Sequence, residues 1–80
     1  MTLTGVSLKK EDENANVKIM QKRLYDLGYI EEADNVTGYY GDVSEKAVQQ
    51  FQQANGMKGT GTADNATLLK LFDKTAKKAG

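Results

Sequence analysis

The side chains that most often perform catalysis are missing from this sequence. Its 80 residues contain no histidine and no cysteine, so neither the commonest general base at neutral pH nor a thiol nucleophile is present. A serine or threonine nucleophile would lack its usual base. Two carboxyl groups can hydrolyse a glycoside only across a cleft, whereas the adjacent pair Glu31 and Glu32 lies in a polar segment typical of a solvated turn. We therefore expect no catalytic residue, no metal and no cofactor, and do not predict an enzyme.

The residues that could contact a ligand are polar and planar. An exposed tyrosine ring, as predicted for Tyr39, can lie against a sugar ring while its hydroxyl forms a hydrogen bond. Glutamine and asparagine amides both donate and accept hydrogen bonds, and an arginine can meet a carboxylate. Glutamine is also an ordinary helix-forming surface residue, so a plain solvated face is the competing interpretation. The predicted ligand-binding residues are Arg23, Tyr39, Gln49, Gln53 and Asn55.

Two further glutamines are predicted to be structural. Gln21 and Gln52 each follow an apolar helix residue, Met20 and Phe51. An amide at such a position can bond the backbone of an adjoining loop, whose buried polar groups would otherwise lack partners. We favour this role over a ligand contact for both.

Length and charge narrow the functional classes. Eighty residues make one small domain, of a size that buries only about 60% of its unfolded surface. Eleven acidic residues balance eleven basic ones, so the field that phosphate-backbone binding usually needs is absent and nucleic acid is not an expected partner. No apolar run approaches the roughly 20 residues of a membrane span, and residues 1–10 contain no signal-peptide apolar stretch. The chain is either a module of a longer protein or leaves the cytoplasm by another route.

A central helix is predicted over residues 41–56. Asp42 is expected to be its N-cap, and Glu45, three residues on, would complete a capping box. Gly56 is suited to end the helix, because glycine adopts a left-handed backbone without a Cβ penalty. The inner face carries apolar residues at helical spacing: Ala47, Val48, Phe51 and Ala54.

Two more helices are predicted on either side of it. The first covers residues 14–28, with Asn14 or Asn16 as its N-cap and a stop at Gly28. Its apolar stripe consists of Val17, Met20, Leu24 and Leu27. The other begins at the N-cap Asp64 and runs to about Ala76. Its stripe consists of Leu68, Leu71, Phe72 and Thr75.

The pattern predicts an all-α fold, a compact three-helix bundle that buries the three stripes together. The Gly-rich connections 29–41 and 57–63 are expected to be fixed turns. An internal half-repeat is also visible, because Val17-x-x-Met20-Gln21 is echoed by Val48-x-x-Phe51-Gln52 and each run leads to a Gly-containing loop. The half-repeat indicates two related helix-loop units that share the central helix.

The order and spacing of these residues resemble the peptidoglycan-binding domain-like family, the three-helix wall-binding module of bacterial and phage cell-wall hydrolases. The matches in the first helix and at its end are Val17, Met20, Gln21, Leu24, Leu27, Gly28 and Tyr29. Those around the central helix are Tyr40, Gly41, Ser44, Ala47, Val48, Phe51, Gln52, Gly56 and Met57. Those near the end are Thr60, Gly61, Asp64, Thr67 and Leu71. The resemblance covers residues 8–72 and departs from the family at Glu11, where a glycine is frequent and a glutamate does not readily adopt a left-handed backbone.

The resemblance implies both packing roles and a function. Tyr40, before Gly41, corresponds to a core-facing aromatic of the family. The family's members imply a non-catalytic module that binds peptidoglycan and targets an attached or partner lytic enzyme to the wall, outside the cytoplasm. The expected partners are peptidoglycan and a catalytic cell-wall hydrolase domain in the same chain, and the module itself is expected to be a monomer.

Two alternatives stay open. The first is a protein-interaction or pro-segment-like domain that packs against a catalytic domain without binding glycan. An exposed apolar patch over Ile30 and Tyr39 would favour it, whereas a polar groove would favour glycan. The second is the wall-targeting part of a phage lysin.

The sequence also predicts domain limits. Residues 1–7 are expected to be a flexible arm or linker remnant, although the part near Leu8 could pack on the domain. Residues 8–76 would form the domain, and residues 77–80 a frayed C-terminus.

Overall fold

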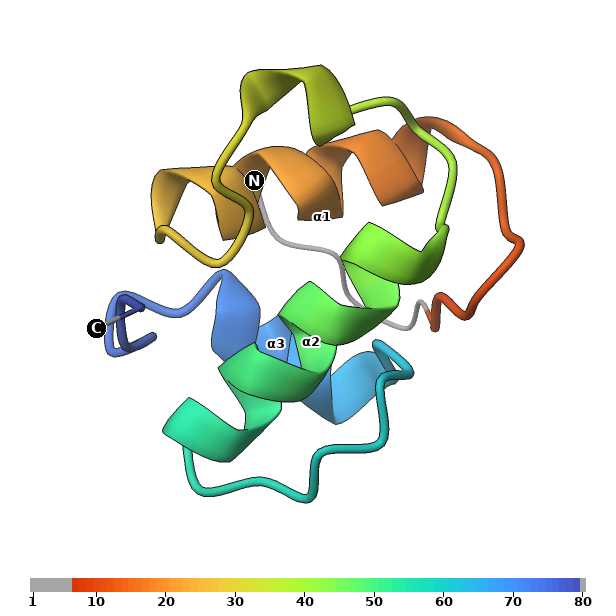
Figure 1. The fold of residues 1–80 in the computed structure, drawn as a ribbon. Helices are drawn as coiled ribbons and strands as arrows, with labels where there is room; N and C mark the ends of the chain where they lie inside the picture. The colour runs from red at the N-terminus through yellow and green to blue at the C-terminus, as the bar shows by residue number, and fades with distance from the viewer. Residues whose placement is uncertain (1–6, 80) are drawn as a thin grey trace.

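The computed structural model describes residues 7–79 and contains three α-helices: α1 (Ala15–Asp26), α2 (Asp42–Ala54) and α3 (Asn65–Leu71). A short 3-10 helix, η1 (Ala33–Asn35), lies between α1 and α2 (Figure 1). The described residues form no strand, only the isolated bridges Leu8–Ala63 and Glu13–Tyr39. The predicted compact all-helical fold is confirmed. The predicted arm over residues 1–7 lies, except for Ser7, outside the described residues.

The three helices pack around one apolar core. Helix α1 contacts both α2 and α3, and α2 runs through the middle of the molecule (Figure 1). The ring of Phe51 on α2 is fully buried, and Tyr29 meets it edge-on with ring centroids 5.5 Å apart. The buried apolar residues are Leu8, Val17, Met20, Leu24, Leu27, Tyr29, Ile30, Tyr40, Ala47, Val48, Phe51, Ala63, Leu68 and Leu71. Ala54, predicted on the inner face of α2, is instead exposed at the last residue of that helix.

Helix α1 begins and ends close to its predicted limits. The Asn14 side chain accepts a hydrogen bond from the Val17 N–H at 3.0 Å, which is the N-cap geometry. After the last turn, Gly28 has a φ of +90°, so the chain reverses at a residue with no Cβ to clash.

The start of α2 differs from the prediction. Asp42 is its first residue and Gly41 is the N-cap, with no side-chain cap bond. The Asp42 carboxylate pairs with Lys10 of the N-terminal segment, and Glu45 lies 3.7 Å from the same ammonium group. The predicted capping box is therefore wrong, because both carboxylates face a cation from another part of the chain. A glycine at position 41 is favoured for a separate, steric reason, because a Cβ there would lie 3.2 Å from the Tyr39 ring.

Helix α3 is much shorter than predicted. Its start is as expected, because the Asp64 side chain accepts from the Thr67 N–H at 2.9 Å. It ends at Leu71, however, and not near Ala76. The Asp73 carboxylate accepts hydrogen bonds from both the N–H and the hydroxyl of Thr75, each at 2.8 Å. Such local side-chain bonds compete with the helix, and they leave Thr75 exposed and outside the core stripe.

The first Gly-containing loop is held by the Gln21 amide. Its oxygen accepts from the backbone N–H groups of Thr37 (2.9 Å) and Gly38 (2.7 Å). Its nitrogen donates to the Tyr39 carbonyl and the Ser44 hydroxyl, both at 2.7 Å. All four positions of this buried amide are used. Three of the bonds join the backbone of the loop, the role predicted for Gln21, and the fourth joins a hydroxyl on α2.

The second loop is held in the same way by Gln52. Its oxygen accepts from the Gly61 N–H at 3.0 Å, and its nitrogen donates to the Thr62 carbonyl and the Thr67 hydroxyl. The half-repeat is therefore structural: each helix presents one glutamine to a turn around a positive-φ glycine, and to one hydroxyl on the next helix. The buried hydroxyl of Tyr40 links the two units, because it donates a hydrogen bond to the Gly61 carbonyl in the second loop. Burial raises the pKa of Tyr40.

Both ends of the described chain are attached to this frame. Leu8 is buried and exchanges two backbone hydrogen bonds with Ala63. Glu11 has a φ of +79°, so the backbone keeps the left-handed turn that the sequence placed in doubt at this residue. Residues 77–79 were expected to fray but form hydrogen bonds with the domain. The Lys77 carbonyl accepts from the Tyr29 hydroxyl, and the Lys77 N–H donates to the Asn55 side chain. The Ala79 N–H donates to the Leu27 carbonyl.

Candidate functional site

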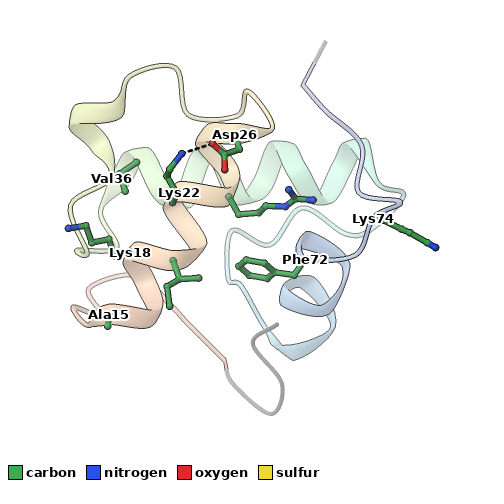
Figure 2. Close-up of a pocket in the computed structure, with 9 residues that line it drawn as sticks. Ala15, Lys18, Lys22, Asp26, Val36, Phe72 and Lys74 are labelled. Carbon is green, nitrogen blue, oxygen red and sulfur yellow. Dashed lines mark hydrogen bonds and ion pairs between the residues drawn. The ribbon is translucent and has the colours of Figure 1, made fainter. Parts of the chain in front are cut away.

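A groove with a volume of about 740 Å³ lies between α1 and the segment that follows α3. Figure 2 shows its residues, which come from α1, from Val36 after η1 and from the turn after Leu71. The lining residues are Ala15, Lys18, Ile19, Lys22, Arg23, Asp26, Val36, Phe72 and Lys74. Three separate parts of the chain thus meet around this hollow.

The floor of the groove is apolar. Ile19, Val36 and Phe72 are each partly buried, and the Phe72 ring points towards α1 in Figure 2. Phe72 owes this position to the early end of α3, because it is the C-cap residue and the chain turns away directly after it.

The rim of the groove is positively charged. Four cationic side chains and one carboxylate line it, an excess of three positive charges in a chain whose net charge is zero. Lys22 is paired with Asp26 at 2.7 Å. Lys18 and Lys74 form no ion pair with a described residue and lie at opposite ends of the groove (Figure 2). The groove can therefore attract an anionic ligand that also has apolar groups.

Arg23 is the cation that links α1 to α3. Its Nε donates to the Leu71 carbonyl at 2.9 Å, which ties α1 to the C-terminal turn of α3. No described residue accepts a hydrogen bond from its two terminal nitrogens. A guanidinium held at one nitrogen and open at the others suits a carboxylate, because its planar fork can donate two parallel hydrogen bonds.

A second, smaller hollow of about 250 Å³ lies between the α1–α2 connection and α2. Its residues are Tyr29, Ile30, Glu31, Glu32, Asn35, Val43, Lys46, Ala47 and Gln50. Glu31 and Glu32 are exposed, as expected for a solvated turn. Within residues 7–79, no group of three or more histidine, cysteine or acidic side chains gathers where it could hold a metal ion.

The structure does not bring the five predicted ligand-binding residues together. Arg23 alone lines the main groove. Tyr39 is 45% exposed and packs along Gly41, while Gln49 and Gln53 lie over the glycines of the second loop, Gly61 and Gly59.

Asn55 differs from the other four, because internal hydrogen bonds engage both ends of its amide. Its nitrogen donates to the Phe51 carbonyl at 2.8 Å, and its oxygen accepts from the Lys77 N–H at 3.0 Å. This side chain caps α2 and holds the C-terminal segment.

Sequence reasoning missed most of the groove. Lys18, Ile19 and Lys22 surround Arg23 on one side of α1, and this cationic and apolar grouping could have been noticed. Phe72 and Lys74 could not, because the prediction carried α3 through both positions. Both residues line the groove from the turn that follows the end of α3 at Leu71.

Comparison with known proteins gives a family and one relative. The family model described as "Putative peptidoglycan binding domain" matches residues 13–71. The chain is also 37% identical over 65 residues to an "Uncharacterized protein in bpoA1 3'region" of Kitasatospora aureofaciens, a match that covers 80% of this chain and 53% of the relative. The chain therefore spans about half the length of that relative. None of the helices in the described part of the chain has the length and apolarity needed to cross a membrane.

Proposed function

Because the chain belongs to the peptidoglycan-binding domain family, we propose that it is a non-catalytic module that targets a lytic enzyme, attached or separate, to the bacterial wall. The observation that carries the proposal is the family match over residues 13–71, which spans all three helices and both Gly-containing loops. The family implies association with the cell wall, which supports an extracytoplasmic location.

A single groove on so small a domain should bind weakly, with a Kd on the order of 10 µM to 1 mM. Weak binding is sufficient for targeting, because the wall is a polymer with many copies of the ligand. An enzyme linked to the module meets its substrate at a high effective concentration.

The test joins the 80-residue chain to a wall-lytic catalytic domain and measures the release of soluble fragments from insoluble sacculi. We expect the fusion to release fragments faster than the catalytic domain alone. Both should cleave a soluble wall fragment at the same rate, since targeting does not alter the chemistry. Equal rates on sacculi would contradict the targeting role.

The apolar floor of the groove favours a second candidate, a pro-segment-like domain that packs against a catalytic domain. Ile19, Val36 and Phe72 are side chains of the kind that a protein surface would cover. The patch predicted over Ile30 and Tyr39 does not support this candidate, because Ile30 is only 1% exposed. In the same assay, the separate chain would slow cleavage of the soluble fragment if it acted as an inhibitor. An unchanged rate would exclude that role.

Tyr39 stays a candidate contact outside the groove. Its ring is 45% exposed, so it is open to a sugar face. Tyr39→Ala should reduce retention on sacculi without unfolding the domain, because the ring contributes little to the core. Unchanged retention of the folded variant would show that the aromatic contact is wrong.

A further inference from the structure

We propose that the groove binds the peptide stem of peptidoglycan and not its glycan strand, with a stem carboxylate on the guanidinium of Arg23. This inference rests on the proposed wall-binding function and names the part of the polymer that is recognised. It follows from the charge, the hydrogen-bonding groups and the shape of the groove.

The charge of the groove favours the stem over the glycan strand. The alternating amino sugars of peptidoglycan are N-acetylated and carry no cationic or free acidic group once the stem is attached, whereas the peptide stem carries free carboxylates. Lys22 is neutralised by Asp26, which leaves Arg23, Lys18 and Lys74 to attract anions. In a chain with no net charge, this local excess favours the anionic part of the polymer.

The hydrogen-bonding groups of the lining favour the stem as well. Sugar hydroxyls and N-acetyl groups both donate and accept hydrogen bonds, so side chains that do the same, such as amides and hydroxyls, suit them best. The nine lining residues include no asparagine, glutamine, serine, threonine or tyrosine. Their polar groups are cations, which donate only, and one carboxylate that is already paired. A carboxylate, which only accepts hydrogen bonds, matches a lining whose open polar groups only donate, and this favours the stem over the glycan.

The position of Arg23 also favours the stem. Its bond to the Leu71 carbonyl at 2.9 Å fixes the guanidinium beside Phe72, the next residue along the chain. A ligand carboxylate on the open nitrogens of Arg23 would therefore have its neighbouring methyl groups over the apolar floor. Alanine residues of a stem peptide supply such methyl groups next to carboxylates, so one short peptide satisfies both parts of the groove.

An NMR titration of the 15N-labelled 80-residue protein tests this proposal. The probe is the synthetic peptide L-Ala-γ-D-Glu-L-Lys-D-Ala-D-Ala with free carboxylates, and the two comparison ligands are its fully amidated form and chitotetraose. We expect the free-acid peptide to shift the amide signals of Ile19, Arg23 and Phe72, and the amidated peptide to bind at least tenfold more weakly. Shifts in the groove with chitotetraose, or shifts with the peptide that map elsewhere, would overturn the proposal.

Matched charge variants separate the groove from general attraction. Lys18→Gln and Lys74→Gln change exposed side chains of the groove and should each weaken peptide binding about threefold. Arg23→Gln should weaken it at least tenfold. Lys58→Gln removes an exposed cation outside the groove and should leave binding unchanged. Equal losses from Lys58→Gln and from Lys18→Gln or Lys74→Gln would mean that only net charge matters, against the proposal.

Retention on sacculi separates recognition of the stem from binding to the wall. If the wild-type protein is retained and the peptide produces no shifts, the stem assignment is wrong while wall binding stands. If the folded wild-type protein is not retained, the proposed function fails and the stem assignment falls with it.

Discussion

At the scale of single residues, the Gln21 amide supplies hydrogen bonds that hold the first Gly-containing loop. This amide pairs with the backbone of Thr37, Gly38 and Tyr39 and with the Ser44 hydroxyl. The sequence predicted this role because a polar amide beside a core residue needs nearby partners. It could not predict the hydroxyl partner, Ser44, which comes from the next helix.

Gln21→Glu tests this role with almost no change in shape. The new carboxylate oxygen would face the Tyr39 carbonyl and lose both donated bonds, so we expect the free energy of unfolding to fall by about 3 kcal/mol. Urea denaturation measures the change. The control is Gln50→Glu on the exposed side of α2, for which we expect a change within about 0.5 kcal/mol. Equal stability of the two variants would contradict the role of the amide.

Asp64 makes the stability depend on pH. Hydrogen bonds from the Thr67 side chain and N–H lower the pKa of this N-cap carboxyl in the folded state. A lowered folded-state pKa means that the stabilisation is complete above the unfolded pKa of about 4 and is lost as the pH falls through the folded value. Asp64→Asn keeps a capping acceptor and removes this titration. Thermal melts at pH 6 and pH 2.5 should therefore show a smaller decrease for the variant than for the wild type, and an equal decrease would contradict the assignment.

At the scale of elements, the apolar stripes predicted the three helices, whereas the residues at which the helices begin and end were harder to predict. Asp64 caps as predicted, and Asn14 is the cap of the two predicted candidates, Asn14 and Asn16, because these side chains need reach only the next turn. Asp42 does not, because Lys10 lies close to it in space though 32 positions away in sequence. The end of α3 was also missed, because Asp73 and Thr75 form a local bond that competes with a good helical pattern.

Phe51→Ala tests the central element. Phe51 is fully buried and meets Tyr29 edge-on, so truncation should cost about 3 to 5 kcal/mol. A domain of this size has little more than that in total, and we expect loss of the cooperative thermal transition in circular dichroism. Leu69→Ala, at an exposed position on α3, is the control and should keep the transition. A folded, cooperative Phe51→Ala variant would mean that the core does not depend on the Phe51 ring.

At the scale of the whole molecule, the half-repeat and the groove have different origins. The half-repeat forms a frame of two loops, each held by a glutamine, and the sequence pattern predicted this half-repeat. The groove is formed where that frame is asymmetric, between α1 and the turn after the short α3. Its residues come from segments about 50 positions apart, and no local pattern links them.

The central claim is that this frame carries a wall-binding surface, and co-sedimentation with purified peptidoglycan sacculi tests it most directly. The folded 80-residue protein is incubated with sacculi, with chitin and with cellulose, and the bound fraction is measured at low and high salt. The account predicts retention on sacculi alone, reduced at high salt because cations line the groove. Equal retention on all three polymers, or none on sacculi from a sample shown to be folded, would contradict it.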